Sequence, residues 1–593
     1  MVKKASQFLN HKYRNAGIIL LTTIVLLIVV FFLFLNSYLT PKLSDKLKSA
    51  VLTGSEGLYQ LNFSKAELHL LRGNVVLYDV VLKPDTRVFH SMQLQSKAPA
   101  YLYQLKVKQI LISNAQFFNL YFHKKLEIGE ITIEKPELQL SQYNQNNKQP
   151  AAKDNKTIYQ KLSKSLRSVH VGLINLNDIR FTYKTFTGTQ PESSTLQHTY
   201  LKVTDLLIDS ATQYDKSRTL FCKEVNTRLE HFSGTTANGL YQFKFRSINL
   251  STRTSRLTAT GLTLLPLPAT IFFSKTKLDR FNLYLDSVSL NNINFESIRN
   301  RPDLDITRMT ISKGRFDVYS NPNAPAINND RRVTFPNWII GHMKSILNVD
   351  TFDFDHLKIT YTEFNETSED AGTVSFDNTK GRFLHISNKK ENVAKYPEST
   401  VKLSTFVLGN GKFDLDLGFS LNDSTLRYHY TGHLGALNLK EGNPVFVPLV
   451  LARVSSGNLQ SFDFNVNASQ TGASGKFTLL YNNLKIDLLG HNYSGYSKRP
   501  LISIVANAIV LKSDNPDKNK TVPRIANINY FRPAKISFFK SLWLTILAGV
   551  KPSAGVGTAT ISPVKSLTKK EQRQQARSIK NGARKAKREE KNG

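Results

Sequence analysis

Beyond Pro41, apolar and polar residues alternate one by one over most of the chain. The clearest run lies between Lys412 and Asn422, where apolar side chains alternate with Asp, Gly and Ser. Successive side chains of a β-strand point to opposite faces, so this alternation predicts strands with one buried face. About 26 segments of ordinary strand length follow this pattern, and helical periodicity is confined to short pieces. The sequence therefore predicts a mainly β protein.

The alternating segments occur twice along the chain. LEIGEITIEKPELQL (126–140) aligns without a gap with LDITRMTISKGRFDV (304–318), 178 residues later. The segments 171–186 and 349–364 align at the same offset, and the polar linkers between the blocks coincide as well. The upstream blocks, Tyr59 to Pro84 and Tyr241 to Pro266, align at an offset of 182. These matches predict a tandem duplication of a β-rich unit of about 180 residues.

Strands with one apolar face must bury that face against another layer, and the chain has too few predicted helices to cover so many strands. Two solutions remain, a series of conventional sandwiches or barrels, or one long antiparallel sheet curled into a groove. The duplication favours the groove, because a second copy extends it while retaining its cross-section. We therefore predict an elongated, curled antiparallel sheet with a few short helices, and an apolar interior suited to acyl chains.

An uncharged segment from Asn15 to Leu39 precedes the β-rich body. Residues 17–35 cover about 28 Å as a helix, close to the ~30 Å hydrocarbon core of a bilayer. The alternative is a cleavable signal peptide, but the apolar run is too long for one and no small-residue cleavage site follows it. Four basic residues before the segment favour a cytoplasmic N-terminus. We predict a cytoplasmic segment at 1–16 and an uncleaved transmembrane anchor at 17–36.

Charge and cysteine content narrow the class of partner. The formal net charge is +34, so the surface is expected to attract anionic partners such as lipid headgroups, acidic polysaccharide or nucleic acid. Cys222 is the single cysteine, which excludes an intrachain disulfide and a cysteine-rich metal site. A nucleic-acid partner conflicts with a body that lies outside the cytoplasm. The expected partners are membrane phospholipids, and an outer-membrane or envelope component at the C-terminal region.

Three segments resemble the AsmA family of envelope proteins, part of the repeating-β-groove, bridge-like lipid-transfer superfamily. The first combines the basic N-terminus and apolar span with LNFSKAELHLLRGNVVLYDVVLKPD (61–85). The second is the series of short apolar strands in 108–140. The third is 450–489, with a Ser-Gly turn at Gly457, a second glycine at Gly475 and Tyr481 before the last strand. The resemblance covers most of residues 1–490, whereas the part after about residue 500 matches no pattern of the family.

This resemblance implies a single-pass inner-membrane protein whose body lies in the periplasm and shelters phospholipid acyl chains in a hydrophobic β-groove. It also implies a role in outer-membrane lipid homeostasis, with no catalytic residue, cofactor or metal. The alternative is a non-catalytic envelope scaffold or an assembly factor for outer-membrane proteins. After the anchor, the expected parts are a first groove repeat at 37–232, a second at 233–399, an AsmA-like region at 400–535, an apolar helical segment at 536–563 and a disordered basic tail at 564–593.

The candidate groove residues are the alternating apolar positions of the repeat-matched strands and of the clearest run. Their alternative interpretation is an ordinary sealed core. They are Ile179, Phe181, Tyr183, Leu357, Ile359, Tyr361, Phe413, Leu415, Leu417, Phe419 and Leu421.

The C-terminal segments have two interpretations each. Residues 536–550 are too short to span a bilayer and predict either an interfacial helix, with Trp543 at headgroup level, or a helix that covers the far end of the sheet. The tail from Val564 carries eleven Lys and Arg against three Glu. Such a tail is either a site for anionic lipid, lipopolysaccharide or peptidoglycan, or a solvated extension.

Motifs of catalysis are weak. His429 and His433 are four residues apart in a strand-like context, whereas a zinc-protease motif requires a helix. Asp355 and His356 would point to opposite faces of one strand. GNGK at 409–412 has neither the spacing nor the Ser/Thr of a phosphate-binding loop. A hydrolase is therefore the least favoured class, and we expect no enzyme activity, cofactor or metal.

Overall fold

The structure is a computed structural model of the 593-residue chain. It describes residues 43–69, 72–95, 97–99, 101–143, 158–163, 165–186, 192–236, 238–276, 278–300, 303–321, 331–492, 495–498, 511–533 and 536–555. The chain divides into two units. The first comprises Met1–Pro325, Ile339–Thr362 and Ser375–Phe406, and the second comprises Ala326–Trp338, Glu363–Val374 and Val407–Gly593.

The described residues are mainly β, as the alternating pattern predicts. Their strands are β1 (Tyr59–Asn62), β2 (Lys65–His69), β3 (Asn74–Pro84), β4 (Tyr101–Ala115), β5 (Lys125–Glu134), β6 (Glu137–Tyr143), β7 (Ser168–Phe186), β8 (Glu192–Ile208), β9 (Cys222–Thr235), β10 (Tyr241–Ser251), β11 (Arg256–Pro266), β12 (Arg280–Ile293), β13 (Leu304–Ser320), β14 (Leu347–Asn365), β15 (Asp370–Ser387), β16 (Glu398–Val407), β17 (Gly411–Ser420), β18 (Tyr428–Leu434), β19 (Leu437–Asn438), β20 (Ala452–Ala468), β21 (Gly472–Asn492), β22 (Gly495–Lys498) and β23 (Ile525–Phe531).

Helices are short and lie between the strands. They are α3 (Leu43–Gly54), α4 (Thr86–Leu94), α5 (Phe117–His123), α6 (Ile158–Leu162), α7 (Ala269–Lys275), α8 (Phe295–Asn300), α9 (Pro336–Gly341), α10 (Lys390–Lys395), α11 (Asn443–Val450) and α13 (Phe538–Ser553), with 3₁₀ turns η2 (Thr212–Tyr214), η3 (Arg331–Thr334) and η4 (Leu439–Gly442). Within the described residues, no helix combines the length and the apolarity that crossing a bilayer requires. The predicted anchor at 17–36, the segment before it and the basic tail lie outside the described residues.

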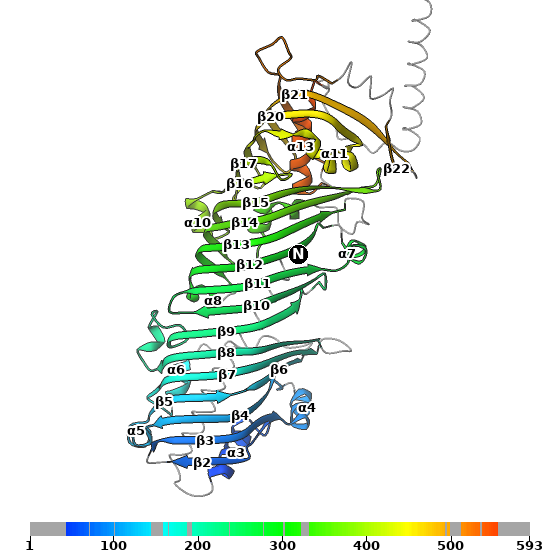
Figure 1. The fold of residues 1–593 in the computed structure, drawn as a ribbon. Helices are drawn as coiled ribbons and strands as arrows, with labels where there is room; N and C mark the ends of the chain where they lie inside the picture. The colour runs from blue at the N-terminus through cyan, green and yellow to red at the C-terminus, as the bar shows by residue number, and fades with distance from the viewer. Residues whose placement is uncertain are drawn as a thin grey trace, which may run out of the picture. The chain divides into compact units, whose positions relative to one another are not determined.

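In the first unit the strands form one long, mostly antiparallel sheet that follows the chain order. β3 pairs with β4, β7 pairs with β8, and the ladder continues without interruption through β9, β10, β11 and β12 to β13. Figure 1 shows these strands stacked side by side from blue to green, with β14 and β15 next in order. A sheet of many successive strands is therefore confirmed.

The sheet departs from the predicted antiparallel arrangement where β7 joins β5 and β6. β4 pairs antiparallel with both β5 and β6, and β7 pairs parallel with both. β5 and β6 therefore occupy a single position in the sheet, interrupted at Lys135 and Pro136. Proline has no N–H to give to a ladder, and here it only accepts a hydrogen bond, from the N–H of Arg180 to its carbonyl (2.8 Å). Because β7 runs parallel to β6, the chain between Tyr143 and Ser168 must cross back to the end of the sheet where β5 begins.

The duplication predicted from the sequence is visible in the strand registers. Tyr59 lies opposite Pro84, and Tyr241 lies opposite Pro266, which is the same pair at the offset of 182. A pair of cross-strand neighbours has its counterpart as well, since β5 and β7 place Glu127 beside His170 and the residues 178 positions later are hydrogen-bonded. The side chain of Asn348 donates to Asp305 (2.9 Å), at the positions 178 residues later.

Left-handed residues interrupt the strands at matching positions of the two copies. In β7 the buried side chains are Ile174, Leu176, Ile179 and Phe181, so two residues instead of one separate the middle pair. Asp178 (φ 56°) lies in this gap, where the register with β8 shifts. Such a bulge inserts one residue and so keeps both halves of the strand apolar on the same face. The matched left-handed pairs are Gly73 and Ser255, Asp79 and Gly261, Asn114 and Asn292, Lys135 and Lys313, and Asp178 and His356.

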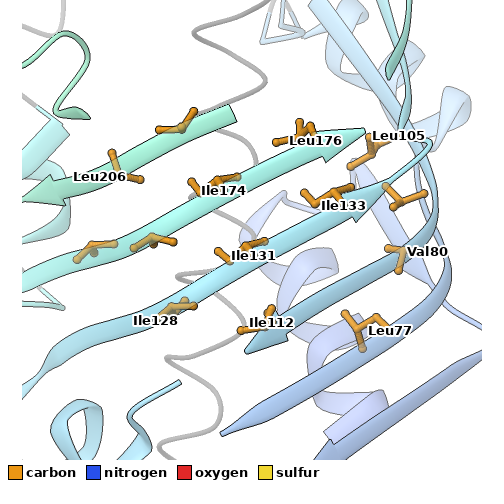
Figure 2. Close-up of a cluster of buried hydrophobic side chains, with 14 of the residues drawn as sticks. Leu77, Val80, Leu105, Ile112, Ile128, Ile131, Ile133, Ile174, Leu176 and Leu206 are labelled. Atoms are coloured by element: carbon orange, nitrogen blue, oxygen red, sulfur yellow. The ribbon is translucent and has the colours of Figure 1, made fainter. Parts of the chain in front are cut away.

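One apolar cluster lies along one face of β3 to β9, and we call it the first-repeat face. Figure 2 shows its side chains rising from neighbouring strands on the same side of the sheet, with Ile131, Ile133, Ile174 and Leu176 at the centre. Ile131, Ile174 and Leu176 are completely buried. Burial of such side chains is the main favourable contribution to folding in this part of the chain.

The second unit is built on the antiparallel strands β17, β18, β20, β21 and β23. α13 packs on β21 and β23 with its small residues, and Ser541, Thr545 and Gly549 are buried in this contact. A Cβ atom at Gly549 would lie 2.3 Å from Cγ of Phe477. The apolar segment 536–550 thus lies on the sheet of the second unit as a covering helix.

The two copies predict a difference in stability between matched substitutions. Ile131 is completely buried, whereas Met309, its equivalent 178 residues later, is only partly buried. We expect Ile131→Ala to lower the free energy of unfolding by about 3–4 kcal/mol, and Met309→Ala by about half of that. Urea denaturation of the full chain measures both. Equal losses would contradict the different burial of the two faces.

A conserved contact of the two copies predicts a pH effect. The hydroxyl of Tyr59 accepts the backbone N–H of Tyr103 (3.2 Å), and Tyr241 accepts that of Phe281 (3.4 Å). Burial raises the pKa of each tyrosine from 10.0 to about 12. The protonated form is therefore favoured in the folded chain, and its contribution is complete below pH 10 and lost as the pH rises toward 12.

We expect Tyr59→Phe to destabilise the chain by about 1–2 kcal/mol below pH 10, because the N–H of Tyr103 loses its acceptor. The gap in the free energy of unfolding between wild type and variant should narrow between pH 10 and pH 12. Chemical denaturation at both ends of this range measures the gap. A gap that does not change with pH would show that the phenol of Tyr59 titrates alike in the folded and unfolded chain.

Candidate functional site: an apolar sheet face

The first group of candidate residues lies inside the sealed first-repeat face. Ile179 is 3%, Phe181 6% and Tyr183 3% exposed, and all three belong to its cluster. They lie on the far half of β7, beyond the bulge at Asp178. Phe181 and Tyr183 pair with β6 on one side and β8 on the other, and Ile179 pairs with β8. The structure brings the three residues together in a sealed core, which was the alternative interpretation of these positions.

The matching residues of β14 are less enclosed. Leu357 is 9% exposed, and Ile359 and Tyr361 are only half-buried. Leu357 and Ile359 belong to a second cluster, formed by β10 to β14. We call this cluster the second-repeat face. The same backbone positions are thus covered in one copy and partly open in the other.

The residues of β17 divide into two groups. Phe413, Leu415 and Leu417 are half-buried on one side of the strand, and Leu421 lies just beyond its end. Phe419 is 2% exposed and packs under α13, where the ring of Phe538 lies 5.8 Å away. Phe419 therefore belongs to the sealed aromatic core of the second unit.

The second-repeat face consists of rows of apolar side chains that cross the strands. Ile248 lies opposite Ala259, Ala259 opposite Val288, and Val288 opposite Ile311. A neighbouring row runs through Leu250, Leu257, Leu290 and Met309 in the same manner. Neighbouring strands are about 4.8 Å apart, so each row offers an apolar track of roughly 15 Å across four strands.

The two faces differ in how much of their apolar surface is covered. Among the described residues, the first-repeat face has 28 buried members and 13 partly buried ones. The second-repeat face has five buried members and ten partly buried ones. The second-repeat face is therefore mostly half-open, although its backbone repeats that of the first.

Several partly buried members of the second-repeat face were missed by the sequence analysis. The sequence signal for them was present, since Phe352 and Phe354 match the completely buried Ile174 and Leu176 at the offset of 178. Alternation alone did not reveal them, because the bulge at His356 shifts the period between Phe354 and Leu357. The repeat, applied residue by residue, would have found them.

The opposite face of the first unit is polar and carries a hollow of about 580 Å³ over β7 to β11. Its lining includes Asn175, Asn226, Lys202, Arg228 and Arg256. Asn175 donates to Glu130 (2.9 Å), and Arg228 pairs with Glu230. Amide, hydroxyl and cationic groups at this place suit an anionic or hydroxyl-rich partner rather than an apolar one.

Among the described residues, no group of three or more His, Cys, Asp and Glu side chains is arranged to hold a metal ion. His433 shares a hydrogen bond with Asp463 (2.6 Å) on the adjacent β20, and His429 is exposed. His356 and Asp355 form an exposed pair with each other (2.8 Å). His433 therefore lies in a cross-strand pair, and His356 in a pair with its sequence neighbour.

Comparison of the chain with protein-family models and with curated proteins gives no match. A proposal for the function therefore rests on the sheet, its two faces and their chemistry.

The cover on the second unit can be tested at Gly549. Gly549→Ala should destabilise the chain by about 1–3 kcal/mol, because the added methyl group meets the ring of Phe477 at van der Waals overlap. Gly54→Ala at the end of α3 is the matched control, since no atom lies within 4 Å of its Cβ position. Thermal unfolding of the two variants measures the difference. A neutral Gly549→Ala would mean that α13 does not lie so close to β21.

Proposed function

We propose that the chain binds phospholipid acyl chains on the second-repeat face, which forms the wall of an apolar groove, and that it transfers them as a membrane-anchored envelope protein. The observation that carries this proposal is the half-open apolar surface of β10 to β14, where ten of fifteen clustered apolar side chains are only partly buried. Large contiguous apolar surface is rarely left open in soluble monomers and typically marks a binding site.

The dimensions and chemistry of the face suit an acyl chain. One leaflet of a bilayer core is about 15 Å thick, so an acyl chain matches an apolar row across four strands. Each CH₂ group removed from water contributes about 0.8 kcal/mol, which lowers the cost of taking a lipid through an aqueous space. Non-directional contacts of this kind allow a lipid to slide from row to row. Reaction chemistry is not needed for such a role.

In this proposal the two copies have different roles, because the first-repeat face is sealed and the second-repeat face is half-open. The side chains of the first-repeat face are packed against one another, so this face stabilises the sheet. The second copy repeats the backbone and carries Phe352, Phe354 and Met309 at positions where the first has Ile174, Leu176 and Ile131. Phe rings are larger than the side chains they replace, and the flexible side chain of Met309 can adapt to a variable ligand.

Polar substitution on the second-repeat face tests this function. Leu290 and Met309 lie opposite each other on β12 and β13. The double variant Leu290→Gln, Met309→Gln should reduce co-purifying phospholipid about three- to tenfold, because two apolar contacts are lost. Mass spectrometry of lipid extracted from the purified full chain measures the amount bound.

The matched control is Ser289→Gln, Thr310→Gln, because these residues form the next opposed pair of the same strands and point to the polar face. The control should retain lipid at the level of the wild type. A wild-type chain free of lipid, or equal loss in both double variants, would rule out binding at the second-repeat face.

The second candidate function is a non-catalytic scaffold or assembly factor in the envelope, and the polar hollow over β7 to β11 favours it. Its cations Lys202, Arg228 and Arg256 offer a site for an anionic polymer. A scaffold would lose its partner on replacement of these cations by Gln and would tolerate polar substitution at Leu290 and Met309. Lipid transfer predicts the reverse.

A further inference from the structure

The short helix α5 carries three aromatic side chains that are largely exposed. Phe118 is 80%, Tyr121 60% and Phe122 68% exposed. The three lie at positions i, i+3 and i+4, so they form one face of the helix. The rings of Tyr121 and Phe122 contact edge to face with their centroids 4.9 Å apart. We call these three residues the aromatic patch.

The helix itself is firmly held, so the patch is presented in a fixed orientation. Leu120 is buried in the first-repeat face, and Phe117 packs against the same cluster. Asn119 donates to Glu127 (2.9 Å) on β5, and the N–H of Gln116 donates to the carbonyl of Glu127 (2.9 Å). One side of α5 thus holds it on the sheet, while the opposite side carries the aromatic patch.

The duplication provides an internal comparison for the patch. α8 is the equivalent helix of the second copy, and the N–H of Asn294 donates to the carbonyl of Asp305 in the same manner (2.9 Å). Phe295 takes the place of Phe117. At the positions of Phe118, Tyr121 and Phe122, however, α8 has Glu296, Arg299 and Asn300. The fold therefore does not require the aromatic side chains.

Three exposed cations lie next to the end of α5 in the first copy. Lys124 and Lys125 follow α5 directly, and the N–H of Arg167 donates to the carbonyl of Lys124 (2.8 Å). Within the described residues, none of the three has a carboxylate at ion-pair distance. The second copy has Pro302, Asp303 and Ser345 at these positions. The second copy therefore has no cation at these three positions.

We propose that α5 docks onto the surface of an anionic bilayer. Phe118, Tyr121 and Phe122 enter the boundary between headgroups and acyl chains, where aromatic rings are favoured. Lys124, Lys125 and Arg167 lie against the anionic headgroups. The combination of an apolar face with a cationic border suits a lipid surface, whereas a second copy of this basic chain would be repelled.

The position of α5 along the chain agrees with this partner. Val51 of α3 packs against the same cluster as Leu120 of α5. α3 begins seven residues after the end of the predicted anchor at 17–36. If that anchor spans a membrane, the start of α3 lies within roughly 25 Å of the bilayer. The docking of α5 does not depend on lipid binding at the second-repeat face.

A fluorescent label placed on the patch tests the proposal in the full-length chain. Cys222 is completely buried, and burial raises the pKa of its thiol to about 12, so a thiol-directed label is expected to spare it. Phe118→Cys and its equivalent Glu296→Cys are labelled separately with an environment-sensitive nitrobenzoxadiazole dye. Each protein is reconstituted with vesicles that contain spin-labelled lipid, at about three parts phosphatidylcholine to one part phosphatidylglycerol.

The label at position 118 should shift to shorter wavelength and be quenched at least about twofold, while the label at position 296 should not change. Raising the salt from about 0.05 M to about 0.5 M should weaken the quenching at 118. Lys124→Gln, Lys125→Gln, Arg167→Gln in the Phe118→Cys background should weaken it in the same way and leave the urea midpoint unchanged.

Four results would overturn the proposal. Equal quenching at positions 118 and 296 would indicate general contact with vesicles, and absence of quenching at 118 would exclude docking. A label at 118 that is already shielded without vesicles would indicate a protein partner on the patch. Quenching of the same size in pure phosphatidylcholine, with no effect of salt, would exclude the role of the three cations.

Discussion

The structure depends on one constraint, that each strand has a single apolar face and must keep that face on the same side of the sheet along its whole length. Strict alternation fails when a strand of 19 residues, such as β7, twists through a long sheet. Left-handed residues such as Asp178 and Lys135 solve this by inserting one position, after which the apolar side chains return to the same face. Long strands with continuous faces follow from these bulges.

The duplication shows how one backbone can carry different surfaces. Registers, bulges and the tyrosine contacts of β1 and β10 match between the copies. Burial does not match, because the first-repeat face is closed and the second-repeat face is mostly half-open. α5 and α8 also differ, since α5 carries exposed aromatic rings and α8 has Glu296, Arg299 and Asn300 at the same positions. The features shared by the two copies therefore indicate what folding requires, and the differences mark the surfaces for which a function is proposed.

Part of the candidate face could be predicted from the sequence. The alternation in β17 predicted Phe413, Leu415 and Leu417 on one side of a strand, where they lie. It also selected Phe419, which is under α13, because alternation does not reveal which stretch of a strand a helix covers. Phe352 and Phe354 were missed for a local reason, the shift of period at His356. The parallel return of β7 was missed because hydrophobic pattern carries no strand direction.

The sequence by itself determined the class of fold and the existence of two copies, because alternation and a fixed offset are local and additive properties of the chain. Tertiary structure alone decided which apolar side chains are sealed and which remain half-open, since burial depends on every neighbouring strand and helix. It also decided that β5 and β6 share one place beside β7, and that the rings of α5 face away from the sheet. These outcomes come from contacts between residues far apart in the chain, and a pattern read along one strand cannot contain them.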